Sequence, residues 1–209
     1  MTIDQIMRSA PVIPVLVLEE QMDWAELAQT FVSAGLPVLE VTMRTPLALE
    51  AIREMARVPG ATIGAGTVLN ERQLGEAAEC GSRFIVSPGL TTSLAKAVSQ
   101  AGIAYLPGVS TPGDIMRGLD LGFERLKFFP AQALGGIPAL KALAGPFGTV
   151  RFCPTGGIRQ ETAADWLALE AVLCVGGSWF VKRGDDLASI GKRARDAAQL
   201  ATPAHRQLV

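Results

Sequence analysis

Short runs of β-branched and apolar residues recur along the chain at a nearly constant interval. They begin at residues 12, 38, 62, 83, 104, 125, 151 and 171, so consecutive runs start 20 to 26 residues apart. Between them lie segments such as DWAELAQTFVSAG and ERQLGEAAECG, whose apolar residues recur at i, i+3, i+4 and i+7. Strands that alternate with amphipathic helices in this way build a parallel sheet.

Eight strand–helix units without a long linker are the number that closes a parallel sheet into a barrel. We therefore predict one α/β domain over residues 1–209, a (β/α)8 TIM barrel. An open doubly wound sheet usually has fewer strands and a glycine-rich first turn, whereas the turn LEEQMDW has no glycine. We expect residues 1–11 to form a short helix that closes the bottom of the barrel, and residues 201–209 to be a loose tail.

Composition narrows the classes of function. Nineteen basic and twenty acidic residues are scattered along the chain, which argues against a nucleic-acid or anionic-membrane partner. No apolar run approaches the roughly 20 residues of a membrane span, and the first residues do not resemble a secretory leader. Three widely spaced cysteines predict reduced thiols and a cytoplasmic protein. Because the one histidine is His205, we expect no histidine-based metal site and no cofactor.

One lysine and one glutamate occupy positions that face the interior of the predicted barrel. Alternate strand residues point inward, and catalytic groups lie near the carboxyl ends of the strands. The residues of inward parity are Glu40, Thr42 and Arg44 in the second run and Arg125, Lys127 and Phe129 in the sixth. A buried charge is costly unless it is paired or functional. Glu40 and Lys127 therefore form either a structural ion pair or the core of an active site, the interpretation that we favour.

An inward lysine among apolar residues predicts Schiff-base chemistry. The uncharged amine attacks a ketone, and the protonated imine then withdraws electrons as a metal would. Such a lysine needs a pKa lowered from about 10.4 toward about 7–8. We expect Lys127 to be the nucleophile and Glu40 to transfer protons, while Arg44 and Thr67 hold the carboxylate of a 2-keto acid. The sequence leaves open the alternative that Arg44 neutralises Glu40.

Glycine-rich turns after the seventh and eighth runs predict a phosphate site. The segments are TGG at residues 155–157 and GGS at residues 176–178. Barrels commonly bind phosphate at these turns through backbone N–H groups. The alternative is a pair of tight turns with no ligand. The segment SPG at residues 87–89 either lines the same pocket or is a plain turn.

Six segments, in order along the chain, resemble a known family. They are LEVTMRT, GAGTVLN, SPGLT, LKFFPA, AGPFGTVRFCPTGGI and VLCVGGSW. From about Val12 to Phe180, the chain resembles the 2-keto-3-deoxy-6-phosphogluconate (KDPG) aldolases, which are similar in part to 4-hydroxy-2-oxoglutarate (KHG) aldolases. The resemblance implies a metal-independent class I aldolase of the Entner–Doudoroff pathway that cleaves KDPG reversibly to pyruvate and glyceraldehyde 3-phosphate. It also implies a homotrimer of (β/α)8 barrels whose partners are small-molecule substrates.

Residue by residue, the resemblance assigns the Schiff-base lysine to Lys127 and the proton acceptor to Glu40. It implies that Arg44, Thr67 and Lys127 contact the carboxylate of pyruvate, with Pro88 and Phe129 as walls. The implied phosphate and sugar contacts are Thr155, Gly156, Gly157, Gly177 and Ser178. Gln132 stands where many relatives carry glutamate, and we expect little effect on catalysis.

Two other functions fit the same residues. A sibling lyase that acts on KHG or on an epimeric keto-deoxy acid would keep the lysine and the glutamate but would not depend on phosphate. A catalytically silent phosphosugar-binding barrel would bind substrate without releasing pyruvate. The inward pair of Glu40 and Lys127 argues against the silent barrel, because a binding protein has no need of a nucleophile beside a base.

Overall fold

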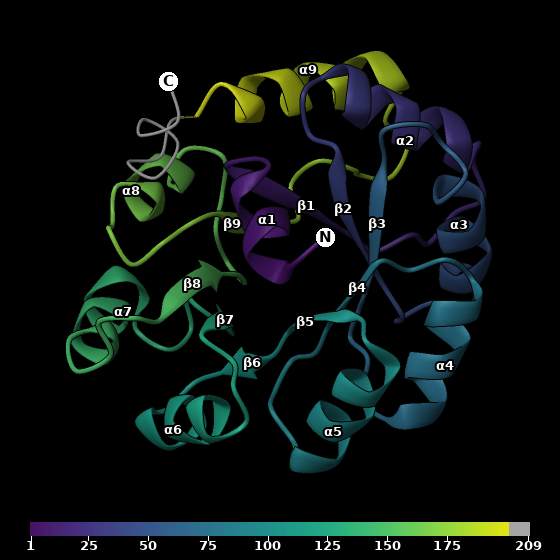
Figure 1. Ribbon diagram of the computed structural model, residues 1–209. Helices are drawn as coiled ribbons and strands as arrows, with labels where there is room; N and C mark the ends of the chain where they lie inside the picture. Colours follow the sequence, from purple (N-terminus) through teal and green to yellow (C-terminus); the bar gives the residue numbers. More distant parts are fainter. Residues whose placement is uncertain (201–209) are drawn as a thin grey trace.

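Helices and strands alternate along the chain in the computed structural model, which describes residues 1–200 (Figure 1). The strands are β1 (Val12–Leu16), β2 (Val38–Thr42), β3 (Thr62–Gly66), β4 (Phe84–Val86), β5 (Ala104–Leu106), β6 (Gly108–Val109), β7 (Arg125–Phe128), β8 (Arg151–Pro154) and β9 (Val175–Gly177). The helices are α1 (Ile3–Arg8), α2 (Trp24–Ser33), α3 (Ala48–Met55), α4 (Glu71–Glu79), α5 (Thr92–Ala101), α6 (Pro112–Asp120), α7 (Gly136–Ala144), α8 (Ala163–Leu167) and α9 (Leu187–Ala198). His205 and the predicted tail lie outside the described residues.

The strands form a curled parallel sheet with helices α2 to α9 around its outer side, while α1 lies across one end of the curl (Figure 1). Six strands are hydrogen-bonded in the order β5-β4-β3-β2-β1-β9, so the last strand pairs with the first, and β6-β7-β8 form a second group. Isolated parallel bridges join Phe152 to Val172 and Thr155 to Gly176. The strand order follows the sequence without the reversal that defines a doubly wound sheet, so the open-sheet alternative is wrong.

The fifth predicted strand is divided into two. Pro107 separates β5 from β6, because proline has no N–H group to donate to a strand ladder. Its carbonyl oxygen instead accepts a hydrogen bond of 2.8 Å from the backbone N–H of Lys127. The run that predicts the fifth strand therefore forms two short strands, β5 and β6.

Successive residues of a strand point to opposite faces of the sheet, and the side chains on the two faces belong to two different hydrophobic clusters. Leu39 and Phe128 belong to the larger cluster, which the helices cover. Val38 and Cys174 belong to a smaller cluster that also contains Met7 of α1. The inward and outward parity predicted for the second and sixth runs is thus confirmed inside β2 and β7, and α1 covers one end of the inner cluster.

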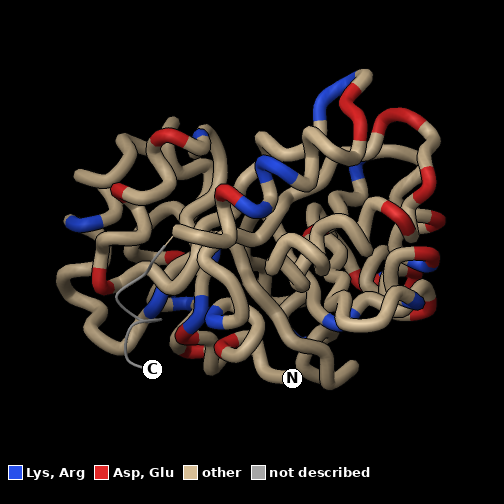
Figure 2. The backbone as a smooth tube through the Cα atoms, turned by 90° about the horizontal axis from the view of Figure 1, so that it is seen from above, with Lys and Arg blue, Asp and Glu red and all other residues tan. Residues whose placement is uncertain are grey.

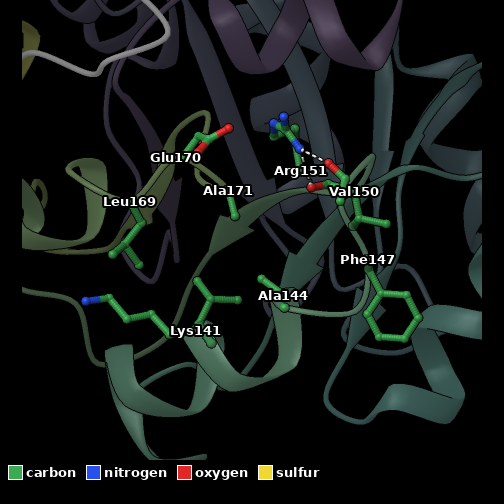
Figure 3. Close-up of a pocket in the computed structure, with 11 residues that line it drawn as sticks. Lys141, Ala144, Phe147, Val150, Arg151, Leu169, Glu170 and Ala171 are labelled. Carbon is green, nitrogen blue, oxygen red and sulfur yellow. Dashed lines mark hydrogen bonds between the residues drawn. The ribbon is translucent and has the colours of Figure 1, made fainter.

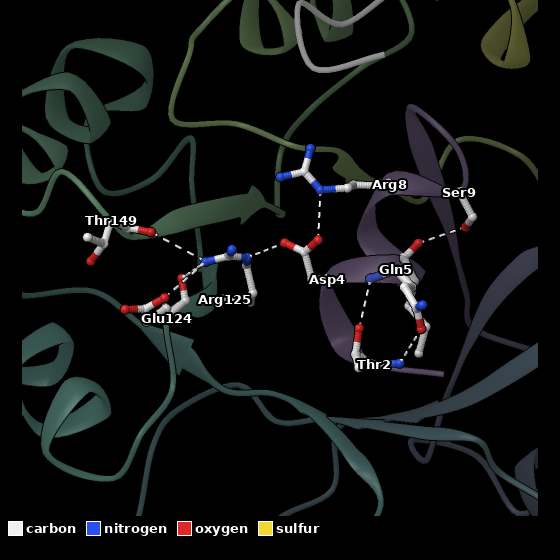
Figure 4. Close-up of polar contacts among 9 residues, drawn as sticks. Thr2, Asp4, Gln5, Arg8, Ser9, Glu124, Arg125 and Thr149 are labelled. Atoms are coloured by element: carbon white, nitrogen blue, oxygen red, sulfur yellow. Dashed lines mark hydrogen bonds and ion pairs between the residues drawn. The ribbon is translucent and has the colours of Figure 1, made fainter. Parts of the chain in front are cut away.

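Polar contacts hold α1 in place (Figure 4). The side chains of Thr2 and Gln5 form a capping box at the start of the helix. The carboxylate of Asp4 accepts hydrogen bonds from Nε of Arg125 on β7 at 2.5 Å and from Nε of Arg8 at 2.7 Å. An ion pair therefore links the helix directly to the strand that carries Lys127.

Basic and acidic residues are interspersed along the backbone (Figure 2). Over residues 1–200, no helix is long and apolar enough to cross a membrane. The three cysteines, Cys80, Cys153 and Cys174, are free and buried, as predicted for thiols that fill space in the core.

Candidate active site

Glu40 on β2 and Lys127 on β7 form a buried ion pair. The Lys127 Nζ atom lies 3.0 Å from Oε1 and 3.3 Å from Oε2 of Glu40. Glu40 is 3% exposed and Lys127 is 4% exposed. Among residues 1–200, these are the two charged residues that are buried. The prediction that they point inward and meet is confirmed.

Glycines in the neighbouring strands make room for this pair. A Cβ atom at Gly66 on β3 would overlap the carboxylate of Glu40. On the other side, Gly108 on β6 is the Cα partner of Lys127 in the parallel ladder. The Phe129 ring lies beside the amine, with Nζ 5.4 Å from the ring centroid. The amine therefore lies beside a carboxylate and an aromatic ring, and the neighbouring strand has a glycine at the position paired with Lys127.

Arg44 and Thr67 lie together just beyond the carboxyl ends of β2 and β3. Arg44 Nε donates a hydrogen bond of 3.0 Å to Thr67 Oγ1. The chain turns after Thr42, so Arg44 lies beyond the end of β2 and is exposed, and the strand alternation from which its inward direction was predicted does not extend to it. Over residues 1–200, the ion-pair partner of Glu40 is Lys127 and not Arg44, contrary to the alternative in which Arg44 neutralises Glu40.

The backbone of Thr67 is strained. Its φ of 59° is the one positive value among the non-glycine residues in positions 1–200. Such a conformation costs a β-branched residue on the order of 1–3 kcal/mol and is most often found at functional sites. The strain places the hydroxyl of Thr67 against the guanidinium of Arg44, where the two donors can converge on one carboxylate.

Pro88 lies in the turn after β4, which packs against Gly108 of β6. A Cβ atom at Gly108 would overlap the carbonyl group of Pro88, so the turn lies directly against β6. Gly108 is in register with Lys127, which brings Pro88 to the same end of the sheet as the amine. Phe129 therefore lies beside the Lys127 amine, and Pro88 lies against the strand that pairs with Lys127.

The turns after β7 and β8 pair with each other. The backbone N–H groups of Ala131 and Gln132 donate to the carbonyl oxygens of Thr155 and Gly156 at 2.8 and 2.9 Å. Gly157 has a φ of 78°, and a Cβ atom there would lie 2.6 Å from Cβ of Gln132. Glycine is therefore required at this position both for its backbone conformation and for space.

Thr155 and the turn after β9 complete this side of the site. The hydroxyl of Thr155 lies where a Cβ atom of Gly176 would be, and an isolated bridge joins the two residues. The indole ring of Trp179 packs over Gly177, while Ser178 is exposed. The predicted residues Thr155, Gly156, Gly157, Gly177 and Ser178 therefore come from adjacent turns at one end of the sheet.

Two thiols lie in the inner cluster near the ion pair. Burial raises the pKa of Cys174 well above its ordinary value, and the Cys153 thiol and the Glu40 carboxylate raise it further. Cys174 therefore stays protonated and is a poor nucleophile. Over residues 1–200, no group of three His, Cys, Asp or Glu side chains is placed to hold a metal ion.

A cavity of about 320 Å³ lies elsewhere, between α7 and the start of β8 (Figure 3). Its walls include Leu140, Phe147, Val150 and Leu169, and Arg151 lines it beside its hydrogen bond to the carbonyl of Val150. None of the predicted site residues lines this cavity. It lies at the amino-terminal end of β8, whereas the candidate site lies at the carboxyl ends of the strands.

Three features of the site were not predicted from the sequence. A side chain at Gly66 or Gly108 would overlap residues of neighbouring segments, and these contacts are not visible in the sequence. The positive φ of Thr67 could not be predicted from the residue type, because threonine rarely adopts this conformation. The alternation of small residues in TIGAG was the one available indication of a crowded inward face.

Comparisons with known proteins agree with this geometry. The family model described as KDPG and KHG aldolase matches residues 3–193. A 2-dehydro-3-deoxy-phosphogluconate aldolase of Zymomonas mobilis is 54% identical over 197 residues, which cover 94% of this chain and 95% of the relative. A KHG/KDPG aldolase of Escherichia coli K12 is 48% identical, with 94% of each chain covered.

Solved structures agree as well. The crystal structure of a 2-keto-3-deoxy-6-phospho-gluconate aldolase from Zymomonas mobilis superposes with a TM-score of 0.95 at 52% identity, covering 98% of this chain and 100% of the other. A KDPG aldolase from Legionella pneumophila, with pyruvate captured as a covalent carbinolamine intermediate, has a TM-score of 0.89 at 40% identity and covers 93% and 97% of the two chains. The chain therefore belongs to the KDPG and KHG aldolase family and is a lyase.

Proposed function

We propose that the protein cleaves KDPG reversibly to pyruvate and glyceraldehyde 3-phosphate, the aldolase step of the Entner–Doudoroff pathway. The buried contact of 3.0 Å between Lys127 and Glu40 carries the proposal. It supplies a nucleophilic amine and a proton carrier within hydrogen-bond reach of each other. Relatives that are 40–54% identical and bear the name of this activity support the choice of substrate.

The reaction proceeds through a Schiff base on Lys127. The Nζ atom attacks the C2 carbonyl of KDPG, and proton transfers through Glu40 release water and leave a protonated imine. Glu40 then accepts the proton of the C4 hydroxyl while the C3–C4 electrons move into the imine. Glyceraldehyde 3-phosphate departs and an enamine remains. Protonation of the enamine at C3 and hydrolysis release pyruvate and restore the amine.

The substrate spans the turns at the carboxyl ends of the strands. Arg44 and Thr67 hold its carboxylate, and Pro88 and Phe129 form the walls around the reacting carbonyl. Thr155 contacts the sugar hydroxyls. The N–H groups of Gly156, Gly157 and Gly177, together with the hydroxyl of Ser178, bind the phosphate, since glycine-rich turns after the last two strands commonly do so in this architecture.

A second candidate substrate is KHG, which has no phosphate. It is favoured by the 48% identical Escherichia coli relative whose name includes both substrates. Both substrates would place the same keto-acid end beside Lys127, and they differ in the half that would lie toward Thr155, Gly157 and Gly177.

A coupled assay tests both proposals. Lactate dehydrogenase and NADH report the pyruvate that is released from KDPG, from its unphosphorylated analogue and from KHG. We expect KDPG to give the highest kcat/KM, because the phosphate contributes binding energy that the other substrates lack. Equal rates with the unphosphorylated analogue would contradict the phosphate site. Substrate binding without pyruvate release would identify the silent barrel.

We also propose the larger organisation that the family implies. The strands close into one (β/α)8 barrel domain, in which β5 and β6 act as a single strand interrupted at Pro107; the bridges between β8 and the β9 segment support this closure. The protein is a homotrimer of the cytoplasm, and three buried free thiols support a reducing compartment. Sedimentation equilibrium is expected to give three times the chain mass of 22.0 kDa, and a monomer would contradict the trimer.

A further inference from the structure

Two buried hydroxyl groups are hydrogen-bonded beside the turn that contains Pro88. Ser87 is 1% and Tyr105 is 3% exposed, and their hydroxyl oxygens lie 2.6 Å apart. Ser87 Oγ also donates to the carbonyl oxygen of Gly89 at 2.6 Å. Because a serine hydroxyl has one hydrogen, Tyr105 must be the donor to Ser87. The hydrogen bonds therefore run from Tyr105 through Ser87 to the backbone of Gly89.

Tyr105 is suited to be a permanent donor. Burial raises its pKa to about 12, although the hydrogen bond with Ser87 opposes the increase. The phenol thus keeps its proton at neutral and moderately alkaline pH. Its ring is held separately by Phe123, which contacts it edge-on with centroids 5.3 Å apart. The hydroxyl and the ring of Tyr105 therefore make different contacts that mutation can separate.

Both ends of this hydrogen-bond chain lie next to segments that border Lys127. At one end, the Pro88 carbonyl occupies the space that a side chain at Gly108 would need, and Gly108 is the Cα partner of Lys127. At the other end, β5 leads from Tyr105 to Pro107, whose carbonyl accepts the backbone N–H of Lys127 at 2.8 Å. A shift of the turn would therefore change the walls around the amine.

We propose that Tyr105 and Ser87 are positioning residues that hold the Pro88–Gly89 turn against β6 and thereby shape the keto-acid end of the site. Neither hydroxyl contacts substrate, because both are consumed by the contacts described above. They act through Pro88, and their loss loosens the wall against which the keto acid is held. This inference rests on the proposed aldolase function and deepens it.

The test is Tyr105→Phe, which removes the hydroxyl and keeps the ring. The protein is incubated with borohydride over a range of pyruvate concentrations, and the rate of covalent trapping is measured. We expect the half-saturating pyruvate concentration to rise about three- to tenfold, the effect of losing one neutral hydrogen bond. The maximal trapping rate, and the KM for glyceraldehyde 3-phosphate in the condensation direction, should stay at the wild-type values, since binding of the keto acid alone is affected.

Phe123→Leu is the matched control. It removes the edge-on ring and keeps the Tyr105 hydroxyl, so the melting temperature should fall while the half-saturating pyruvate concentration stays unchanged. Ser87→Ala breaks both hydrogen bonds and should raise that concentration further than Tyr105→Phe does.

The inference is overturned if Tyr105→Phe matches the wild type, or if it and Phe123→Leu shift the half-saturating concentration equally. If borohydride traps pyruvate on the wild type, either of these results contradicts the positioning role but leaves the proposed function intact. A wild type that borohydride and pyruvate do not modify contradicts the proposed function, and the positioning role with it.

Discussion

Glu40 and Lys127 are both removed from water, which costs each charged group several kcal/mol before their attraction is counted. A buried ion pair of this kind can often be replaced by apolar side chains without loss of stability. Its presence near the carboxyl ends of β2 and β7 is therefore better explained by chemistry than by folding. The strained Thr67 beside Arg44 follows the same pattern, since backbone strain is also a cost that function can explain.

Glu40→Gln separates the catalytic from the structural interpretation of the pair. The amide keeps the shape of the side chain but cannot accept and release a proton as a carboxylate does, so we expect kcat for KDPG cleavage to fall about 100-fold or more. The variant should also unfold at a lower temperature, because Lys127 loses its counter-charge. Kinetics well below that temperature isolate the catalytic effect. Glu79→Gln, at an exposed helical position, should match the wild type in both respects.

A Glu40→Gln variant that melts early yet keeps most of its kcat would show that the pair is structural.

The sequence predicted the pair itself, because one acid and one lysine stand in apolar strands at positions that face inward. It did not predict the Tyr105–Ser87 contact or the role of Gly108, since these depend on how separate strands and turns pack. The alternation of β2 was extended past Thr42 to Arg44, although the chain already turns there and Pro46 follows in the same turn.

At the scale of elements, α1 and β7 are linked by charge as well as by packing. Asp4 of α1 accepts hydrogen bonds from Arg8 of its own helix and from Arg125, which lies two residues before Lys127 on β7 (Figure 4). Burial raises the pKa of Asp4, but the hydrogen bonds and charges of Arg125 and Arg8 more than offset it, so the net pKa is below the ordinary 3.8.

The lowered pKa of Asp4 predicts how stability depends on pH. A carboxylate whose folded pKa lies below its unfolded value contributes stability above pH 3.8 and loses it as the pH falls through the folded pKa. We expect Asp4→Asn to lower the free energy of unfolding at pH 7 by about 1 kcal/mol or less, because the pair is partly exposed. This difference should vanish in more acidic solution. Urea unfolding from pH 7 to pH 2 measures it.

Asp165→Asn, at an exposed position of α8, is the control and should differ little from the wild type at any pH. A deficit of Asp4→Asn that persists undiminished at pH 2 would show that the carboxylate does not act through its charge. Loss of the deficit on acidification would support the link between α1 and β7.

The order of strands and helices was predictable, since the apolar periodicity changes clearly between them. The details at strand ends were less so. Pro107 splits one predicted strand, and in the last apolar run only Val175–Gly177 forms the ladder, because hydrogen-bond partners rather than residue types decide where pairing stops. The link between Asp4 and Arg125 joins residues more than a hundred positions apart and has no local pattern.

The whole molecule brings the candidate residues together through its topology. Within each of the two strand groups, neighbours are parallel, and the last strand pairs with the first, so the turns at the carboxyl ends of the strands lie at one end of the curled sheet. The residues proposed to contact the keto acid come from the turns after β2, β3 and β4 and from the end of β7, and those proposed to bind the phosphate come from the turn after β8 and the end of β9. This arrangement could be predicted from the strand count, whereas closure and assembly depend on contacts between elements and between chains.

Reductive trapping tests the central claim most directly. The wild type is treated with pyruvate and borohydride, and its peptides are mapped by mass spectrometry. We predict a reduced pyruvate adduct on Lys127 together with irreversible loss of KDPG cleavage. Lys127→Ala should show neither the adduct nor the activity, while Lys182→Ala, which removes an exposed lysine, should behave as the wild type does. A wild type that stays unmodified and fully active under these conditions would contradict the Schiff-base mechanism.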